Sequence, residues 1–139
     1  MLTTKNRPAT NLPATRQMIA TPTGLDVGNA GTKVCLGDQK LLIPSYVLPV
    51  HTPLQQIPSQ GYIKYEAGIR ADLHHQAWLA GNAAYNRNPE GYLRVADDRQ
   101  AKIHQALHLL LGALSYAPHR EQWNLKVVAT IHHAREMRT

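Results

Sequence analysis

The residues of this 139-residue chain best suited to chemistry lie within ten positions of one another, in the segment GLDVGNAGTK (residues 24–33). Gly28 and Gly31 bracket a tight turn, since glycine tolerates the positive φ angles that a sharp reversal of the backbone needs. Without side chains at these two positions, backbone N–H groups can converge on an anion. Small polar side chains within the turn can add bonds to phosphate oxygens. We therefore predict that six residues cradle phosphate: Gly28, Asn29, Ala30, Gly31, Thr32 and Lys33.

Two charged residues flank this turn and indicate what would accompany the phosphate. Lys33 opens the returning strand, where its ammonium can supply a point charge to a phosphate. Asp26 ends the preceding strand, and a carboxylate beside a phosphate is useful when a cation is bound there too. Mg²⁺ keeps several of its waters and is often held by one carboxylate together with substrate phosphates. The pattern thus predicts that Asp26 binds Mg²⁺ through water.

A plainer interpretation remains open, because a β-hairpin with a glycine-rich turn and an exposed Asp is common. The segment is not a Walker A loop, since the G-x-x-x-x-G-K-[ST] spacing is absent. Nor is it a dinucleotide-binding fingerprint, since a strand rather than a helix follows the glycines. The sequence of the turn alone does not decide between phosphate binding and a plain hairpin.

The turn lies between two short predicted strands. Leu25–Gly28 precedes it, and the β-branched, apolar segment Thr32–Leu36 follows it. After a Gly-Asp turn signal, Lys40–Val50 is predicted as a third strand, which Pro44 and Pro49 restrict to an edge, a bulge or a strand end. Three consecutive strands joined by tight turns predict an antiparallel meander.

The second half of the chain is predicted to add strands and helices in alternation. Tyr62–Glu66 and Ala77–Ala80 have the composition of strands, and Asn82–Arg87 forms a short helix before an Asn-Pro pair. The longest helix is predicted over residues 98–116. The compact apolar run Leu125–Ile131 is typical of a buried parallel strand.

The helix over residues 98–116 carries the clearest signals. Asp97 or Asp98 caps its start, and Pro118 stops it. Its i, i+3, i+4, i+7 pattern predicts one buried face, made of Ile103, Ala106, Leu107, Leu110 and Leu114. The strand-helix-strand crossover that it forms predicts a parallel strand added to the antiparallel meander. The expected fold class is therefore α/β, with one mixed sheet of five or six strands and helices on it.

Four segments in this order resemble one family of proteins. The D-x-G-x-x-x-x-K pattern of Asp26, Gly28 and Lys33 is similar to the first phosphate loop of the actin, sugar kinase and Hsp70 superfamily. LLIPSYV (residues 41–47) resembles the strand that follows in bacterial and archaeal actin-like proteins, and WLAGNAAYN (residues 78–86) resembles their strand-to-helix turn. The helix containing ALHLLLGAL and the strand LKVVATI resemble the end of their first subdomain. Together these segments favour the plasmid-segregation actins of the ParM or StbA type over the sugar kinases.

The resemblance implies a ribonuclease H-like, actin-type subdomain over residues 24–139, after a disordered leader at residues 1–23. It implies the nucleotide-binding N-terminal part of a filament-forming ATPase in plasmid or DNA segregation, with ATP or GTP and Mg²⁺ as cofactors. It also implies a truncated chain that lacks the family's catalytic Gln or Glu, second phosphate loop and adenosine pocket, so no catalytic residue is predicted. One half of a cleft offers few of the contacts that hold a small ligand. We expect weak or absent ATP binding by this chain alone and no meaningful hydrolysis.

Composition and charge leave several partners open. Fifteen Lys and Arg against nine Asp and Glu give a net charge of +6, which favours anionic partners. These basic residues are scattered, so direct DNA binding by a small basic protein stays an alternative without a specific signal. Another alternative is a non-catalytic relict of the actin fold, or an interaction module that binds a protein or DNA.

The expected protein partners are a second copy of the chain, a full-length actin-like protein or a DNA-bound adaptor. The reason is that the apolar strand Leu125–Ile131 needs cover on both faces. The sequence has no apolar run of transmembrane length, no signal peptide and a single cysteine. We therefore expect a cytoplasmic protein without a membrane partner.

Overall fold

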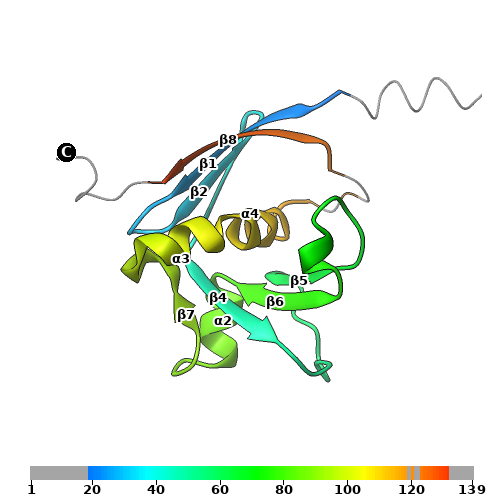
Figure 1. Cartoon of the computed structure of the whole chain (residues 1–139), viewed down its shortest axis with the longest axis vertical. Helices are drawn as coiled ribbons and strands as arrows, with labels where there is room; N and C mark the ends of the chain where they lie inside the picture. The colour runs from blue at the N-terminus through cyan, green and yellow to red at the C-terminus, as the bar shows by residue number, and fades with distance from the viewer. Residues whose placement is uncertain (1–18, 119, 121–122, 132–139) are drawn as a thin grey trace, which may run out of the picture.

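Two β-sheets and the helices next to them make up the computed structural model, which describes residues 19–118, 120 and 123–131 (Figure 1). The first sheet has the strand order β3, β2, β1, β8, with the bounds Gln39–Ile43, Thr32–Leu36, Thr21–Val27 and Leu125–Ile131. β1, β2 and β3 pair antiparallel, whereas β8 runs parallel to β1. This arrangement confirms the predicted α/β class and the predicted meander with a parallel strand added to it.

The remaining strands form a second sheet, so the prediction of one sheet with five or six strands is wrong. Its strand order is β5, β6, β4, β7, with the bounds Tyr62–Tyr65, Gln76–Ala80, Tyr46–Val50 and Leu93–Arg94. All of its pairings are antiparallel.

The chain passes from the first sheet to the second at Pro44 and Ser45. The predicted strand Lys40–Val50 is in fact two strands, because proline has no N–H with which to continue a ladder. The N–H of Tyr46 donates back to the carbonyl of Pro44 at 2.8 Å, which closes a tight bend. This bend brings Ser45 to the inside of the molecule, where its side chain is buried.

The predicted helix over residues 98–116 is two helices that meet at Gln105. The backbone of Gln105 has φ −104° and ψ 7°, which is outside the helical range and ends the first helix. The predicted cap is confirmed, since the Asp98 carboxylate accepts a bond of 3.1 Å from the N–H of Gln100. Among the described residues, the helical segments are α2 (Asn82–Arg87), α3 (Arg99–His104) and α4 (Ala106–Leu114), with the short 3₁₀ turns η2 (Ala71–Leu73) and η3 (Val95–Asp97).

The buried residues of the segment differ from the predicted ones. Ile103 was predicted on the buried face but is 46% exposed, whereas Lys102 is only 2% exposed. The prediction took the apolar stripe through Ile103, whereas the stripe that faces the core runs through Lys102, Leu109 and Ala113. A lysine therefore points into the protein beside the first sheet.

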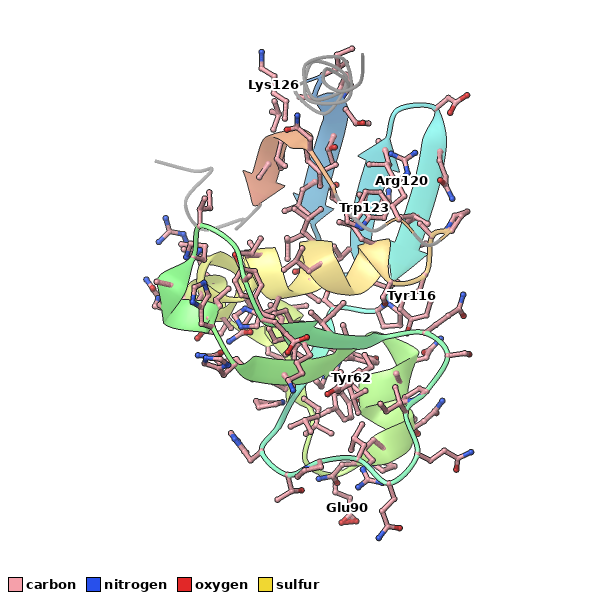
Figure 2. The ribbon with its side chains drawn as sticks, turned by 90° about the vertical axis from the view of Figure 1, so that its right-hand side faces the viewer. Tyr62, Glu90, Tyr116, Arg120, Trp123 and Lys126 are labelled. Atoms are coloured by element: carbon pink, nitrogen blue, oxygen red, sulfur yellow. The ribbon has the colours of Figure 1, made fainter. Side chains whose placement is uncertain are left out.

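Helix α4 lies between the two sheets (Figures 1 and 2) and contacts strands of both. Leu109 and Ala113 are fully buried in one cluster with Val27, Val34 and Trp78. Burying a side chain such as Leu109 contributes about 1.5–3 kcal/mol relative to leaving it exposed. The packed helix thus fixes the two sheets to each other, and with them the turns at the ends of their strands.

Two further points concern the ends of the described chain. β1 begins at Thr21, three residues before the predicted start of ordered structure, because it pairs with β8 from Thr21↔Leu125 onward. Residues 1–18 of the predicted leader lie outside the described residues.

Within the described ranges, no helix has the length and apolar character needed to span a membrane.

Candidate functional site

The turn that joins β1 to β2 has a closed, defined geometry. The N–H of Gly28 donates to the carbonyl of Gly31 at 3.0 Å, so residues 28–31 form a tight reversal. Gly31 has φ +156°, and a Cβ there would lie 3.0 Å from the carbonyl oxygen of Ile43. Gly31 is therefore required by both backbone conformation and space, as the sequence predicted for a glycine in this turn.

The tip of the turn presents unused hydrogen-bond donors to solvent. Asn29 and Ala30 are both exposed, and within the described part of the chain their backbone N–H groups donate to no protein acceptor. Adjacent free N–H groups in a glycine-rich turn are the elements of an anion-binding concavity. The geometry is thus compatible with phosphate at the predicted place.

The two predicted charged residues lie side by side below this tip. Asp26 and Lys33 are direct partners across β1 and β2. Their neighbours Leu25, Val27 and Val34 point to α4, so Asp26 and Lys33 point to the opposite, outer face of the sheet. Lys33 is exposed, and its ammonium is free to reach an anion at the turn.

The carboxylate of Asp26 lies under the turn. Its Oδ1 is shielded from solvent and is 4.0 Å from the position that a Cβ on Gly28 would occupy. The described residues contain no cluster of three or more His, Cys, Asp or Glu side chains for a metal ion. One carboxylate next to a phosphate cradle is nevertheless a donor set that Mg²⁺ accepts, because phosphate oxygens and water supply its other ligands.

A serine from the bend between the two sheets braces the turn. The hydroxyl of Ser45 is 2.9 Å from that of Thr32 and donates to the carbonyl of Gly28 at 3.2 Å. Both side chains are buried. The hydroxyl of Thr32 therefore points inward, and at this position only the backbone faces the turn. The LLIPSYV segment, which contains Ser45, thus has a physical role in holding the turn.

A residue that the sequence did not predict completes the surroundings of the turn. The Nζ of Lys102 on α3 donates to Oδ1 of Asn29 at 2.6 Å. Figure 1 shows α3 beside the turn between β1 and β2. One signal could have found this lysine, because positions 102, 106, 109 and 113 also form a stripe at helical spacing. The apolar pattern favoured the neighbouring stripe, and a lysine is seldom placed in a core.

The glycine of the WLAGNAAYN segment has a different use. Gly81 has φ +68° and ψ −141°, and its N–H donates to the carbonyl of Tyr46 at 2.9 Å. The carbonyl of Gly81 accepts from Ala84 in the first turn of α2. This segment connects β6 to α2, and the donor of its glycine is already used inside the protein.

Two hollows of the surface lie away from the phosphate-loop candidate. An open pocket of about 440 Å³ is lined by α2 and Tyr116, and a larger one of about 710 Å³ lies between β5 and the end of α4. Figure 2 shows Arg120 and Trp123 above α4 and Tyr62 below it. The guanidinium of Arg120 is 4.9 Å from the centre of the Trp123 ring. Neither hollow is lined by residues 26–33.

The fold and the turn together define an α/β domain with a glycine-rich first hairpin. Comparison with known families identifies the domain further: the family of "Actin like proteins N terminal domain" matches residues 24–139. The chain therefore belongs to this family of actin-like N-terminal domains. The membership predicted from the four sequence segments is confirmed.

Comparison with individual proteins gives less information than the family match. No curated protein matches the chain. Among solved structures, the "Crystal structure of apo psk41 parM protein" matches with a TM-score of 0.46 and 17% sequence identity. The match covers 85% of this chain and 38% of that protein, so the chain spans less than two thirds of the length of the solved relative.

Proposed function

We propose that this chain is the nucleotide phosphate-binding N-terminal part of an actin-like, filament-forming ATPase that acts in plasmid or DNA segregation. One observation carries the proposal: the β1–β2 turn exposes N–H groups that donate to no acceptor of the described chain, and Asp26 and Lys33 are paired in the two strands that it joins. The chain's membership of the actin-like N-terminal domains supports a nucleotide as the source of the phosphate.

Each residue has a distinct part in the proposed site. The backbone N–H groups of Asn29 and Ala30 donate to phosphate oxygens, and Lys33 adds a positive charge from the outer face of the sheet. Asp26 holds Mg²⁺ through water, and the ion when bound neutralises part of the phosphate charge. Gly28 and Gly31 let the backbone approach the ligand closely, whereas Thr32 and Ser45 hold the turn from within.

The proposed activity is binding rather than turnover. The turn would contact a phosphate from one side, and residues 26–33 line neither of the two hollows described above. Ligand affinity in a protein site depends on how much of the ligand is enclosed. We therefore expect weak affinity for Mg-ATP, on the order of that given by a few charge-assisted hydrogen bonds.

Calorimetric titration of Mg-ATP into the 139-residue chain tests this function, with Asp26→Ala as the matched variant. The expected result is measurable binding to the wild type that is lost in Asp26→Ala and weakened when EDTA removes Mg²⁺. Equal heats for both proteins, or none for the wild type, would refute the assigned site. GTP and inorganic phosphate in place of ATP show whether the base contributes.

A second candidate function is partner binding by a non-catalytic actin-fold module. It is supported by Leu42 and Val128, which are 66% and 71% exposed on the outer face of the first sheet. Self-association through this face would remove both side chains from water. Analytical ultracentrifugation of the wild type and of a Leu42→Glu/Val128→Glu variant tests it: concentration-dependent assembly that the double substitution abolishes supports the module, and a monomer at every concentration rejects it.

A further inference from the structure

Lys102 is a buried cation in direct contact with the phosphate-loop candidate. Its side chain is only 2% exposed, and lysine is almost never that deeply buried unless its charge is satisfied. One of its bonds goes to Oδ1 of Asn29, at 2.6 Å. This contact connects α3, at position 102, to the tip of a turn 73 residues earlier in the chain.

The chemistry of this bond fixes the orientation of the Asn29 amide. An ammonium group has three donors and no acceptor, so it can contact only the oxygen end of an amide. The oxygen and nitrogen ends of an Asn side chain are normally assigned from such bonds. With Oδ1 held by Lys102, the NH₂ group is the free end, and it donates to no acceptor in the described part of the chain.

Three acceptors of the turn are occupied inside the protein, while three donors at its tip are not. The carbonyl of Gly31 accepts from the N–H of Gly28, and the carbonyl of Gly28 accepts from Ser45. Oδ1 of Asn29 is occupied by Lys102. Three donors at the tip have no acceptor in the described part of the chain: the backbone N–H groups of Asn29 and Ala30 and the NH₂ group of Asn29.

We propose that Lys102 is a positioning residue of the phosphate site, which turns the Asn29 side chain so that its NH₂ group donates to the anion. This inference rests on the proposed function, because it names a further residue of that same site. The ligand is the terminal phosphate of a nucleoside di- or triphosphate, or pyrophosphate, which shares its oxygens and charge. Lys102 acts through Asn29 and also supplies a nearby positive charge that favours an anion.

Substitution of Asn29 by Asp separates this role from a purely structural one. Asn29→Asp keeps an oxygen for Lys102 and strengthens the bond with a second charge, so the fold is retained. The new side chain has no donor and brings negative charge to the tip. Titration with Mg-pyrophosphate and with Mg-ATP should then show affinity at least about tenfold weaker than for the wild type, since one charge-assisted bond is lost and repulsion is added.

A double-mutant cycle shows whether Lys102 acts through Asn29. Lys102→Met keeps the buried stem without the charge and should weaken pyrophosphate binding about tenfold. In an Asn29→Ala background, where there is no amide to orient, the same substitution should weaken binding by about threefold or less, a remainder that reflects charge alone. A denaturation curve for each variant confirms that it is folded at the temperature of titration.

The outcomes distinguish this inference from the function on which it rests. If the wild type binds neither probe, the proposed function fails and Lys102 has no site to serve. If the wild type binds but Asn29→Asp binds equally well, only the role of Asn29 and Lys102 is refuted. An equal loss from Lys102→Met in both backgrounds would also overturn the positioning role, because the lysine would then act without Asn29.

Discussion

Two glycine turns of this chain, the one between β1 and β2 and the one between β6 and α2, show opposite uses of the same residue. Both contain a glycine with positive φ, Gly31 and Gly81. In the first turn the exposed N–H groups of Asn29 and Ala30 are left for a ligand. In the second, the N–H and carbonyl of Gly81 bond to Tyr46 and to α2.

The difference comes from what surrounds each turn. Gly81 is buried between Ile43 and Tyr116, so its backbone groups must find partners inside the protein. The tip of the first turn is exposed, and two buried residues hold it: Ser45 donates to the carbonyl of Gly28, and Lys102 donates to the Asn29 side chain. A glycine-rich turn is therefore a candidate anion site when backbone N–H groups at its tip are exposed and donate to no acceptor of the described chain.

The largest expected effect in this comparison is a loss of stability on Gly81→Ala. An alanine would adopt φ +68°, ψ −141°, which is strained for any residue with a Cβ. The new Cβ would also lie 3.1 Å from the hydroxyl of Tyr116 and 3.2 Å from Cβ of Ile43. We expect the free energy of unfolding in urea to fall by about 2–4 kcal/mol.

Gly28→Ala is the matched substitution in the first turn. Gly28 has no positive φ, and the nearest atom to its new Cβ would be the carbonyl oxygen of Gly31, at 3.3 Å. The cost in unfolding free energy should stay below about 1 kcal/mol. Mg-ATP binding should nevertheless weaken, because the Cβ would lie between the turn and the Asp26 carboxylate. Equal destabilisation by both alanines would remove the contrast between a ligand turn and a structural one.

The next effect concerns the pair of hydroxyls that braces the first turn. Ser45→Ala leaves the buried hydroxyl of Thr32 without this partner and should lower the free energy of unfolding by about 1–2 kcal/mol. Thr32→Val leaves the hydroxyl of Ser45 without this partner and should lower the free energy of unfolding by a similar amount. The double variant replaces both partners by apolar groups and should cost clearly less than the sum of the two. Strict additivity in urea denaturation would show that the two hydroxyls do not interact.

Local patterns of the sequence predicted much of this fold. Asn82–Arg87 and Leu125–Ile131 form the expected helix and strand with the expected bounds, since glycine, proline and apolar runs delimit both. The meander and its parallel neighbour also follow from the order of short strands and tight turns. Membership of the actin-like domains followed from four motifs in sequence, none of which was sufficient alone.

The errors come from effects that a local pattern does not contain. Whether Pro44 ends a strand or only bends it depends on a second sheet that receives the chain. The break at Gln105 has no proline or glycine to announce it. An apolar pattern also favours Ile103 over Lys102 as the buried residue, although the structure buries Lys102. The contact between Lys102 and Asn29 joins residues 73 positions apart, so no spacing rule could have predicted it.

The smallest expected effect is a loss of stability at low pH that comes from His108, a residue outside the first turn. His108 on α4 packs with its ring centre 4.4 Å from that of Trp78 on β6, and its Nδ1 is buried. Burial, and then the positive charge of Arg70, lower the pKa of His108 below its usual value of 6.5, while the charge of Asp72 and a hydrogen bond to the backbone of His104 oppose this change. The imidazole is therefore neutral in the folded protein at neutral pH.

A lowered pKa means that the unfolded chain binds the proton more readily than the folded one. The contribution of neutral His108 to the free energy of unfolding should therefore be complete above pH 6.5. It should decrease as the pH falls from 6.5 toward the lower pKa of His108 in the folded state. His108→Phe keeps an aromatic ring against Trp78 without a titrating group, so denaturation curves between pH 7 and 5 should show a smaller loss of stability than in the wild type. An identical pH dependence in both proteins would show that other groups govern it. Trp78 and His108 lie on β6 and α4, whereas Asp26 lies on β1. The same substitution should therefore leave the Asp26-dependent binding of Mg-ATP at pH 7.5 unchanged. Such a result would show that the stability of α4 and β6 can be changed without changing the phosphate-loop candidate.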